Sequence, residues 1–201
     1  MRRLTTTEWM AASFTVGVAI VLIARVTEGP GERVAVALRA TARWSFLWFW
    51  LASAGGALTT LFGSRFLALA RRARDFGLAF ASAHLAHLAV VAWIFYDHPG
   101  AFSQSAILFF GTAVFWTYLL ALLSWNHLAA KLNPAVWRVL RTVGVEYIAF
   151  AFWADFAPKA LEGGIVNVAV YLPLAILAVA GPPLRLAAAL KRCSEAGAVA
   201  A

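Results

Sequence analysis

The chain has 201 residues, of which 63% are hydrophobic and 13% charged, and its mean hydropathy of +0.78 lies above that of soluble domains. Its net charge of +8 does not indicate a nucleic-acid partner, because the basic residues lie between apolar segments and not on one amphipathic face. Six apolar segments leave no room for a soluble nucleotide-binding domain, and no Gly-rich phosphate loop is present. The composition therefore predicts a multi-pass protein of the lipid bilayer.

The six apolar segments are each long enough, or nearly so, to cross a bilayer as a helix. They are Trp9–Val26, Trp44–Gly63, Gly77–Tyr96, Ala106–Trp125, Val143–Phe156 and Ile165–Ala180. The hydrocarbon core is about 30 Å thick, so a spanning helix needs about 20 residues, and the last two segments need a few flanking residues. Backbone amides in lipid must bond within their own segment. The predicted fold is all-α, a polytopic bundle of six transmembrane helices.

The last apolar segment is followed by a helix-breaking sequence. Gly181-Pro182-Pro183 is predicted to end the sixth helix. The chain shows no internal repeat and no low-complexity linker, so residues 1–193 are assigned to a single six-helix domain and residues 194–201 to a short flexible tail. The single cysteine, Cys193, excludes an intrachain disulfide and a multi-cysteine metal site.

The basic residues divide unequally between the two sides of the predicted bundle. With the N-terminus inside, twelve of the 17 lie in cytoplasmic segments and five in outer segments. Cytoplasmic segments carry an excess of Lys and Arg, so both termini are predicted to be cytoplasmic, in a bacterial cytoplasmic (inner) membrane. Four arginines in the first outer loop run against this rule. On the cytoplasmic side, Arg71, Arg72, Arg74 and Arg141 are expected to contact anionic lipid headgroups or phosphate.

Ionisable side chains inside the apolar segments are few, and a central charge costs about 2.5–3.5 kcal/mol. His84 and His87 share one face of the third helix, and Glu146 and Asp155 lie in the fifth. At a rise of 1.5 Å per residue, His84 lies about 13 Å and Glu146 about 12 Å from the cytoplasmic end. A polar intramembrane contact between Glu146 and His84 is therefore predicted. In the alternative interpretation, two neutral histidines and a protonated glutamate bond separately to nearby helices.

The third to fifth segments carry an ordered series of motifs. Arg71-Arg72-Ala73-Arg74-Asp75-Phe76-Gly77-Leu78 opens the third helix, and His87 follows ten residues after Gly77. The fourth helix contains Gly111 and ends in Leu119-Leu120-Ala121-Leu122-Leu123-Ser124, and Leu132-Asn133-Pro134-Ala135-Val136-Trp137-Arg138-Val139-Leu140 leads into the fifth. In order and spacing, over roughly residues 65–160, these motifs resemble the ferric-reductase-like transmembrane domain family. Within that family they are most similar to the haem-carrying membrane subunits of methionine-sulfoxide reductase systems.

The resemblance implies a b-type haem held by histidines of the third and fifth helices. By this resemblance His87 would be a ligand of the haem iron, and His84 lies one turn nearer the cytoplasm. However, Arg141 stands where the family places one fifth-helix histidine, and no histidine stands near Ala154, where it places another. An arginine donates hydrogen bonds and offers iron no lone pair. The expected cofactor is therefore none or a single b-type haem without bis-histidine ligation, and no metal is expected beyond that haem iron.

Two functions follow from this combination of scaffold and missing ligands. The first is a haem-less or haem-poor relative that acts as a structural, assembly or quinone-contacting subunit of a larger membrane complex. The alternative is a b-type haem electron-transfer subunit that passes electrons across the membrane between a quinone or flavoprotein and a partner reductase. Either function requires other membrane protein subunits, and no catalytic residue is assigned. A proton-coupled transporter using Glu146 and His84 is less favoured, because no inverted repeat is visible.

Overall fold

The computed structural model describes residues 4–29, 31–125, 128–162 and 164–200, which form seven α-helices and no strand. The helices are α1 (Thr6–Thr27), α2 (Arg33–Phe62), α3 (Leu67–Arg71), α4 (Ala73–Asp97), α5 (Gln104–Trp125), α6 (Pro134–Glu162) and α7 (Gly164–Ala200). Short 3₁₀ turns at Ser64–Phe66 and Leu128–Lys131 precede α3 and α6. The all-α prediction is confirmed. Arg2, Arg3 and Ala201, which the topology and tail predictions include, lie outside the described residues.

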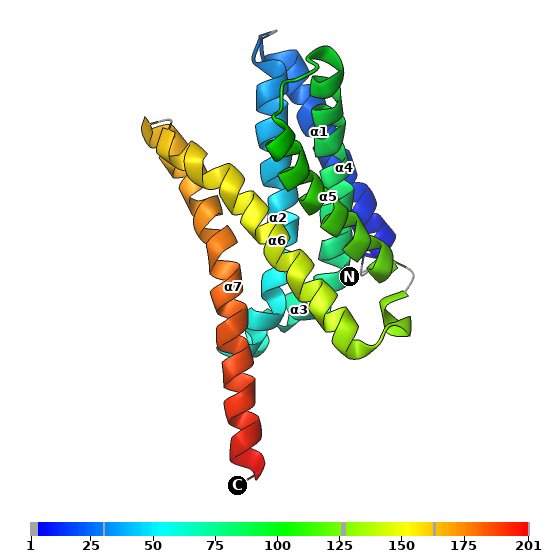
Figure 1. Ribbon diagram of the computed structural model, residues 1–201, viewed down its shortest axis with the longest axis vertical. Coiled ribbons are helices and arrows are strands. Elements are labelled where there is room, and N and C mark those ends of the chain that lie inside the picture. The colour runs from blue at the N-terminus through cyan, green and yellow to red at the C-terminus, as the bar shows by residue number, and fades with distance from the viewer. Residues whose placement is uncertain (1–3, 30, 126–127, 163, 201) are drawn as a thin grey trace.

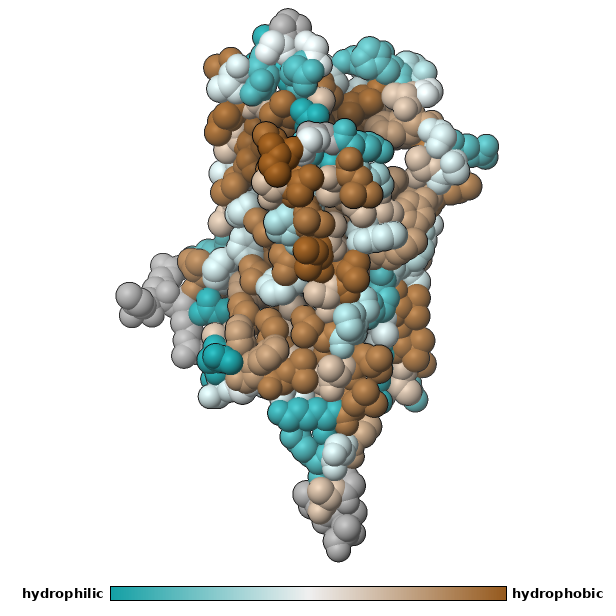
Figure 2. Space-filling model, turned by 90° about the vertical axis from the view of Figure 1, so that its left-hand side faces the viewer, coloured by the Kyte–Doolittle hydropathy of each residue, from teal (hydrophilic) through white to brown (hydrophobic). Residues whose placement is uncertain are grey.

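Five of these helices, α1, α2, α4, α5 and α7, are long and apolar enough to cross a membrane. On the face shown in Figure 2, apolar side chains cover most of the middle of the molecule, and hydrophilic ones gather toward its two ends. α6 is also long, at 29 residues, but six charged side chains along it set it apart from the five. The chain is thus an all-helical protein with five membrane-compatible helices, and the sixth predicted crossing depends on α6.

Local sequence signals set two of the helix ends. α1 begins with a capping box, in which the Glu8 amide donates to the Thr5 hydroxyl at 3.2 Å and the Thr5 amide donates to the Glu8 carboxylate at 2.7 Å. α2 ends at Gly63, whose φ of +87° is a backbone conformation that favours glycine. The chain therefore reverses after α2, and the short α3 leads into α4.

α7 runs through the residues that were predicted to end it. Gly181-Pro182-Pro183 lies inside the helix, so the predicted helix end is wrong. The fixed φ of proline is compatible with a helix, although each proline removes one N–H donor. Beyond the prolines the helix is held by α2, because Lys191 and Arg192 donate to the carbonyl and the hydroxyl of Thr60 at 2.9 and 3.1 Å. Residues 194–200 of the predicted tail continue α7, and their flexibility stays a prediction.

The helices form two parts that share α2 (Figure 1). α1, α2, α4 and α5 stand nearly side by side, whereas α6 crosses them obliquely and pairs with α7. α2 packs against α1, α4 and α7, while α6 packs mainly on α7 and α5. α4 and α6 are therefore neighbours that do not pack closely along their length.

The contact between α1 and α4 is close because both helices carry small residues there. A Cβ atom added to Gly17 of α1 would lie 2.8 Å from the Cβ of Ala86 on α4. Helices in lipid associate through such close approaches, because apolar side chains gain little by leaving an apolar solvent. Gly17 and Ala86 thus allow α4 to lie directly against α1.

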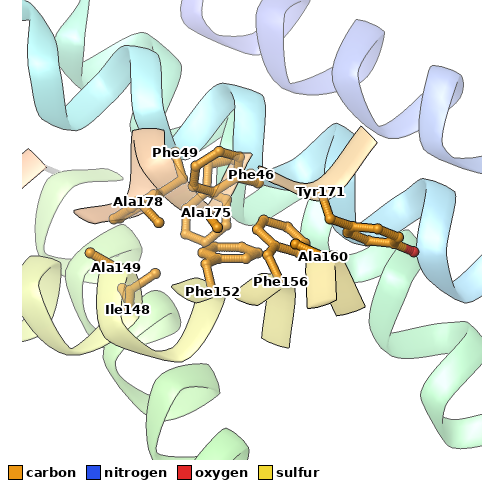
Figure 3. Packing of buried hydrophobic residues seen from close by; sticks show 11 residues of the cluster. Phe46, Phe49, Ile148, Ala149, Phe152, Phe156, Ala160, Tyr171, Ala175 and Ala178 are labelled. Atoms are coloured by element: carbon orange, nitrogen blue, oxygen red, sulfur yellow. The ribbon is translucent and has the colours of Figure 1, made fainter. Parts of the chain in front are cut away.

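A cluster of aromatic rings fills the space between α2, α6 and α7. The rings of Phe46, Phe49, Phe152 and Phe156 meet near the centre of the cluster, and Tyr171 lies beside Phe156 with its hydroxyl directed away from them (Figure 3). The Phe46 ring lies 5.1 Å from that of Phe152 and 5.2 Å from that of Phe156, both in edge-to-face geometry. This cluster joins the two parts of the molecule through α2.

Hydrogen bonds gather the segments assigned to the cytoplasm at one end of the bundle. The Thr6 hydroxyl donates to the Asp75 carboxylate at 2.7 Å and joins the starts of α1 and α4. The Arg74 guanidinium donates to the carbonyls of Ser124 and Trp125 at the end of α5, at 2.9 and 2.8 Å. The bonds from α7 to Thr60 add the end of α2. The predicted inner segments therefore lie together.

Candidate functional site

A cavity of about 340 Å³ lies between α2, α4, α5 and α6 and contains both predicted histidines. Its walls are mostly apolar and include Leu38, Phe80, Leu88, Val91, Phe110, Val114, Ile148 and Phe152. The polar side chains among its lining residues are Arg39, His84, His87, Thr117, Asp155 and Lys159. The volume lies within the range of about 300–1,000 Å³ that is usual for small-molecule sites. Apolar walls with a few polar groups are also typical of such sites.

The two histidines lie side by side on the α4 wall of this cavity. Their ring centroids are 5.1 Å apart and the ring planes differ by 30°, as expected for residues three positions apart on a helix. The His84 ring also contacts Phe80 at 5.5 Å and Phe152 at 6.4 Å between centroids. The His84 imidazole is therefore flanked by aromatic rings, and each imidazole also faces a hydroxyl of α2.

Two hydroxyl groups of α2 orient the imidazoles. The Thr41 Oγ1 atom lies 3.1 Å from Nδ1 of His87, and Ser45 Oγ lies 3.4 Å from Nδ1 of His84. Thr41 and Ser45 are completely buried. The Leu38 backbone, also on α2, makes a further hydrogen-bond interaction with the His87 ring. Nε2 of His84 makes no hydrogen bond within the described residues. Both rings line the cavity.

Sequence reasoning missed Thr41 and Ser45. Thr41 and Ser45 are four residues apart on an apolar helix, and His84 and His87 are three apart on the facing helix. Each pair is therefore about one turn apart and lies on one face of its helix. This pairing of polar positions is visible in the sequence, but it becomes a signal only when α2 and α4 are known to be neighbours.

Two charged residues of α6 close another wall of the cavity. The Lys159 ammonium donates to the Asp155 carboxylate one turn away, and both side chains are partly buried. Both lie close enough to His87 to act on it electrostatically. Arg39, on α2, pairs with Glu32 at 3.6 Å. The charged groups of the cavity therefore belong to ion pairs within the chain.

The structure does not bring Glu146 and His84 together. The Glu146 carboxylate accepts a hydrogen bond from Nε of Arg185 on α7 at 2.8 Å, and His84 faces Ser45 instead. The reason is the oblique path of α6. The residue of α6 beside His84 is Phe152, which lies six positions, or about 9 Å, along the helix from Glu146. The predicted equal depth assumed helices parallel to each other, and α6 leans toward α7.

The four arginines predicted to contact anionic lipid or phosphate have different surroundings. Arg74 holds the end of α5 through two backbone carbonyls, and the Arg72 guanidinium lies 5.8 Å from the centre of the Trp9 ring. Arg71 and Arg141 are exposed at the surface. Arg74 therefore has a structural role, and contact of the set with lipid headgroups stays a prediction.

The donor set of the cavity fits at most one axial ligand of a haem from α4. His84 and His87 lie on one face of one helix, so they cannot occupy opposite sides of the same iron. Neither Arg141 nor Ala154, the positions at which the family places its fifth-helix histidines, lines the cavity. Among the described residues, no group of three or more His, Cys, Asp or Glu side chains is arranged to hold a metal ion. Haem binding and its ligation stay predictions.

Comparison of the chain with protein-family models, with curated proteins and with solved structures finds no match. The resemblance to the ferric-reductase-like family therefore depends on the motifs in the sequence, and the function has to be argued from the site.

Proposed function

We propose that this protein is a six-helix membrane subunit that contacts a quinone in the cavity between α4 and α6, as part of a larger membrane complex. The observation that carries this proposal is the cavity itself. It has apolar walls of aromatic and aliphatic side chains and two imidazoles on one side. A quinone has the same two-part character, because its ring carries two oxygen atoms and its isoprenoid tail is apolar.

α6 is proposed as the sixth crossing of the membrane. Its 29 residues run obliquely between the two ends of the molecule (Figure 1). Two of its carboxylates are paired within the chain, Glu146 with Arg185 and Asp155 with Lys159. Pairing lowers the cost of placing charges inside a bilayer. α6 therefore tolerates an intramembrane position in spite of its charge.

Both termini are proposed to face the cytoplasm of a bacterial inner membrane. The support is the twelve-to-five division of basic residues, together with the hydrogen bonds that gather the inner segments at one end. Reporter fusions at Ala201 and at Gly100 are expected to give opposite readouts. A C-terminal reporter that is active in the periplasm would contradict this orientation.

Quinone contact is tested by binding to the protein in lipid nanodiscs. A short-tailed alkylquinone that carries a photoreactive group is expected to label peptides of α4 and α5, as located by mass spectrometry. Ala113, on α5, lines the cavity, so Ala113→Leu should fill part of it and reduce the labelling about tenfold or more. Thr112→Leu is the matched control, because Thr112 is exposed and does not line the cavity. Equal labelling in both variants would contradict the proposal.

The alternative function, a b-type haem electron-transfer subunit, is favoured by one observation. His87, the residue to which the resemblance gives a ligand role, lines the cavity with its imidazole. A visible absorption spectrum of protein produced with added haem tests this alternative. A single-imidazole haem spectrum that disappears in His87→Phe would support it. Colourless protein that binds the quinone would favour the first function.

A further inference from the structure

The hydroxyl proton of Thr41 is committed to a backbone carbonyl. Thr41 Oγ1 lies 2.7 Å from the carbonyl oxygen of Ala37, one turn earlier in α2. A carbonyl cannot donate, and two oxygen atoms approach this closely only when a proton lies between them. The proton is therefore donated within α2, to this carbonyl or to that of Leu38 at 3.2 Å. Toward His87, 3.1 Å away, the same hydroxyl can only accept.

Ser45 repeats this arrangement one turn further along α2. Its Oγ lies 2.9 Å from the carbonyl oxygen of Ala42, so its single proton is donated there. Toward Nδ1 of His84, at 3.4 Å, Ser45 also presents a lone pair. This contact is longer than the one between Thr41 and His87, and it is the weaker of the two.

The two hydroxyls together determine which nitrogen of each imidazole carries the proton. An imidazole that faces an acceptor at Nδ1 places its proton there, and the neutral ring then has a lone pair on Nε2. Both rings line the cavity, so a ligand there can meet this lone pair. Thr117, which also lines it, donates its proton to the Ala113 carbonyl at 2.8 Å and so presents lone pairs as well. The inner part of the cavity thus offers acceptors.

From this pattern we infer that the cavity selects the reduced, hydroxyl-bearing form of its ligand, a quinol, over the oxidised quinone. The inference rests on the proposed quinone contact and adds a redox preference to it. A quinol donates an O–H group to Nε2 of His87 or His84, whereas a quinone carbonyl would place its lone pairs against theirs. An unmade hydrogen bond at a buried acceptor costs binding energy, so the preference for quinol should be about tenfold or more.

The charged groups of the cavity are the competing donors. Lys159 is paired with Asp155, and Arg39 is paired with Glu32. Arg39 belongs to α2 and Lys159 to α6, so neither cation lies on the α4 wall that carries the imidazoles. Because the imidazoles and not these cations face the ligand from α4, the form with hydroxyl groups binds better.

The tautomers can be measured directly by NMR of protein labelled with ¹⁵N-histidine. The chain has four histidines, so the signals of His84 and His87 can be assigned by replacing each in turn. A protonated Nδ1 and an unprotonated Nε2 are expected at both residues. Thr41→Val keeps the side-chain shape without the acceptor and should release His87 to a mixture of tautomers, whereas Thr41→Ser should preserve the native signal. A protonated Nε2 in the native protein would overturn the inference.

Binding of matched ligands tests the preference itself. An alkylhydroquinone, its dimethyl ether and the corresponding alkylquinone are titrated anaerobically into the protein in nanodiscs by calorimetry. The hydroquinone should bind about tenfold or more tightly than the other two, and Thr41→Val should reduce the difference. Equal binding of all three would overturn the redox preference but leave the quinone site standing. Binding of none would refute the proposed function and the preference with it.

Discussion

The two sides of α4 differ in how closely the neighbouring helices approach. α4 packs mainly against α1 and α2, and Gly17 of α1 lies against Ala86 without space for another atom. Toward α5 and α6, it faces the cavity, and Thr117 is the single buried residue among those described in α5. One side therefore holds α4 and its histidines in position, and the other side leaves the space that a ligand can occupy.

The proposed position in a membrane gives this difference a physical basis. Small residues and hydrogen bonds bring helices together, because apolar surface is equally well solvated by lipid tails. α4 has both on the side of α1, where the Ser13 hydroxyl also donates to the Ala79 carbonyl at 2.9 Å. α6 pairs Glu146 with Arg185 of α7, the helix on its other side. The cavity persists because α6 is held from the other direction.

The largest effect is expected on the tight side of α4. Gly17→Leu would force α1 away from α4, because even the first added carbon would lie 2.8 Å from Ala86. The free energy of unfolding should fall by about 3 kcal/mol, the upper part of the range for overpacking. Thermal unfolding of the protein in detergent measures this loss. The control is Gly111→Leu on α5, where an added Cβ meets nothing within 4 Å. A similar loss for both variants would refute the contrast between the two sides.

The second effect concerns the contact that holds α6 away from α4. Glu146→Gln removes the charge that Arg185 faces, and the two terminal amino groups of Arg185 already lack a partner among the described residues. The guanidinium would then lie unneutralised between α6 and α7. Both side chains are partly exposed, at 34% and 23%, so the loss should be about 1–2 kcal/mol and smaller than for a fully buried pair. Unchanged stability in the same unfolding assay would contradict the ion pair.

The sequence predicts the helices better than it predicts their contacts. Apolar length locates five membrane-compatible helices, and the intramembrane rule selects His84 and His87, which the structure places together in one cavity. The partner of Glu146 was not predictable in this way. Depth along a helix follows from the sequence, but the tilt that turns α6 toward Arg185 depends on packing between helices distant in the chain. The hydroxyls of Thr41 and Ser45 were missed for the same reason.

The smallest effect is expected at the ion pair between Asp155 and Lys159 within α6, at the wall of the cavity. Asp155→Asn makes the same chemical change as Glu146→Gln, but its partner Lys159 is one turn away on the same helix. This pair joins no two helices, its side chains are 28% and 35% exposed, and the asparagine oxygen can still accept from the ammonium. Pairs of this spacing contribute about 0.2–0.5 kcal/mol, so the loss of stability should not exceed that range. Asp155→Asn and Glu146→Gln are compared in one unfolding assay. Each variant replaces one carboxylate of α6 by its amide, so a difference in stability reports the contact that was lost. A loss of equal size at Asp155 would mean that the cavity wall contributes as much to stability as the contact between α6 and α7. The difference between the two sides of α4, the one toward α1 and α2 and the one toward the cavity, would then be refuted.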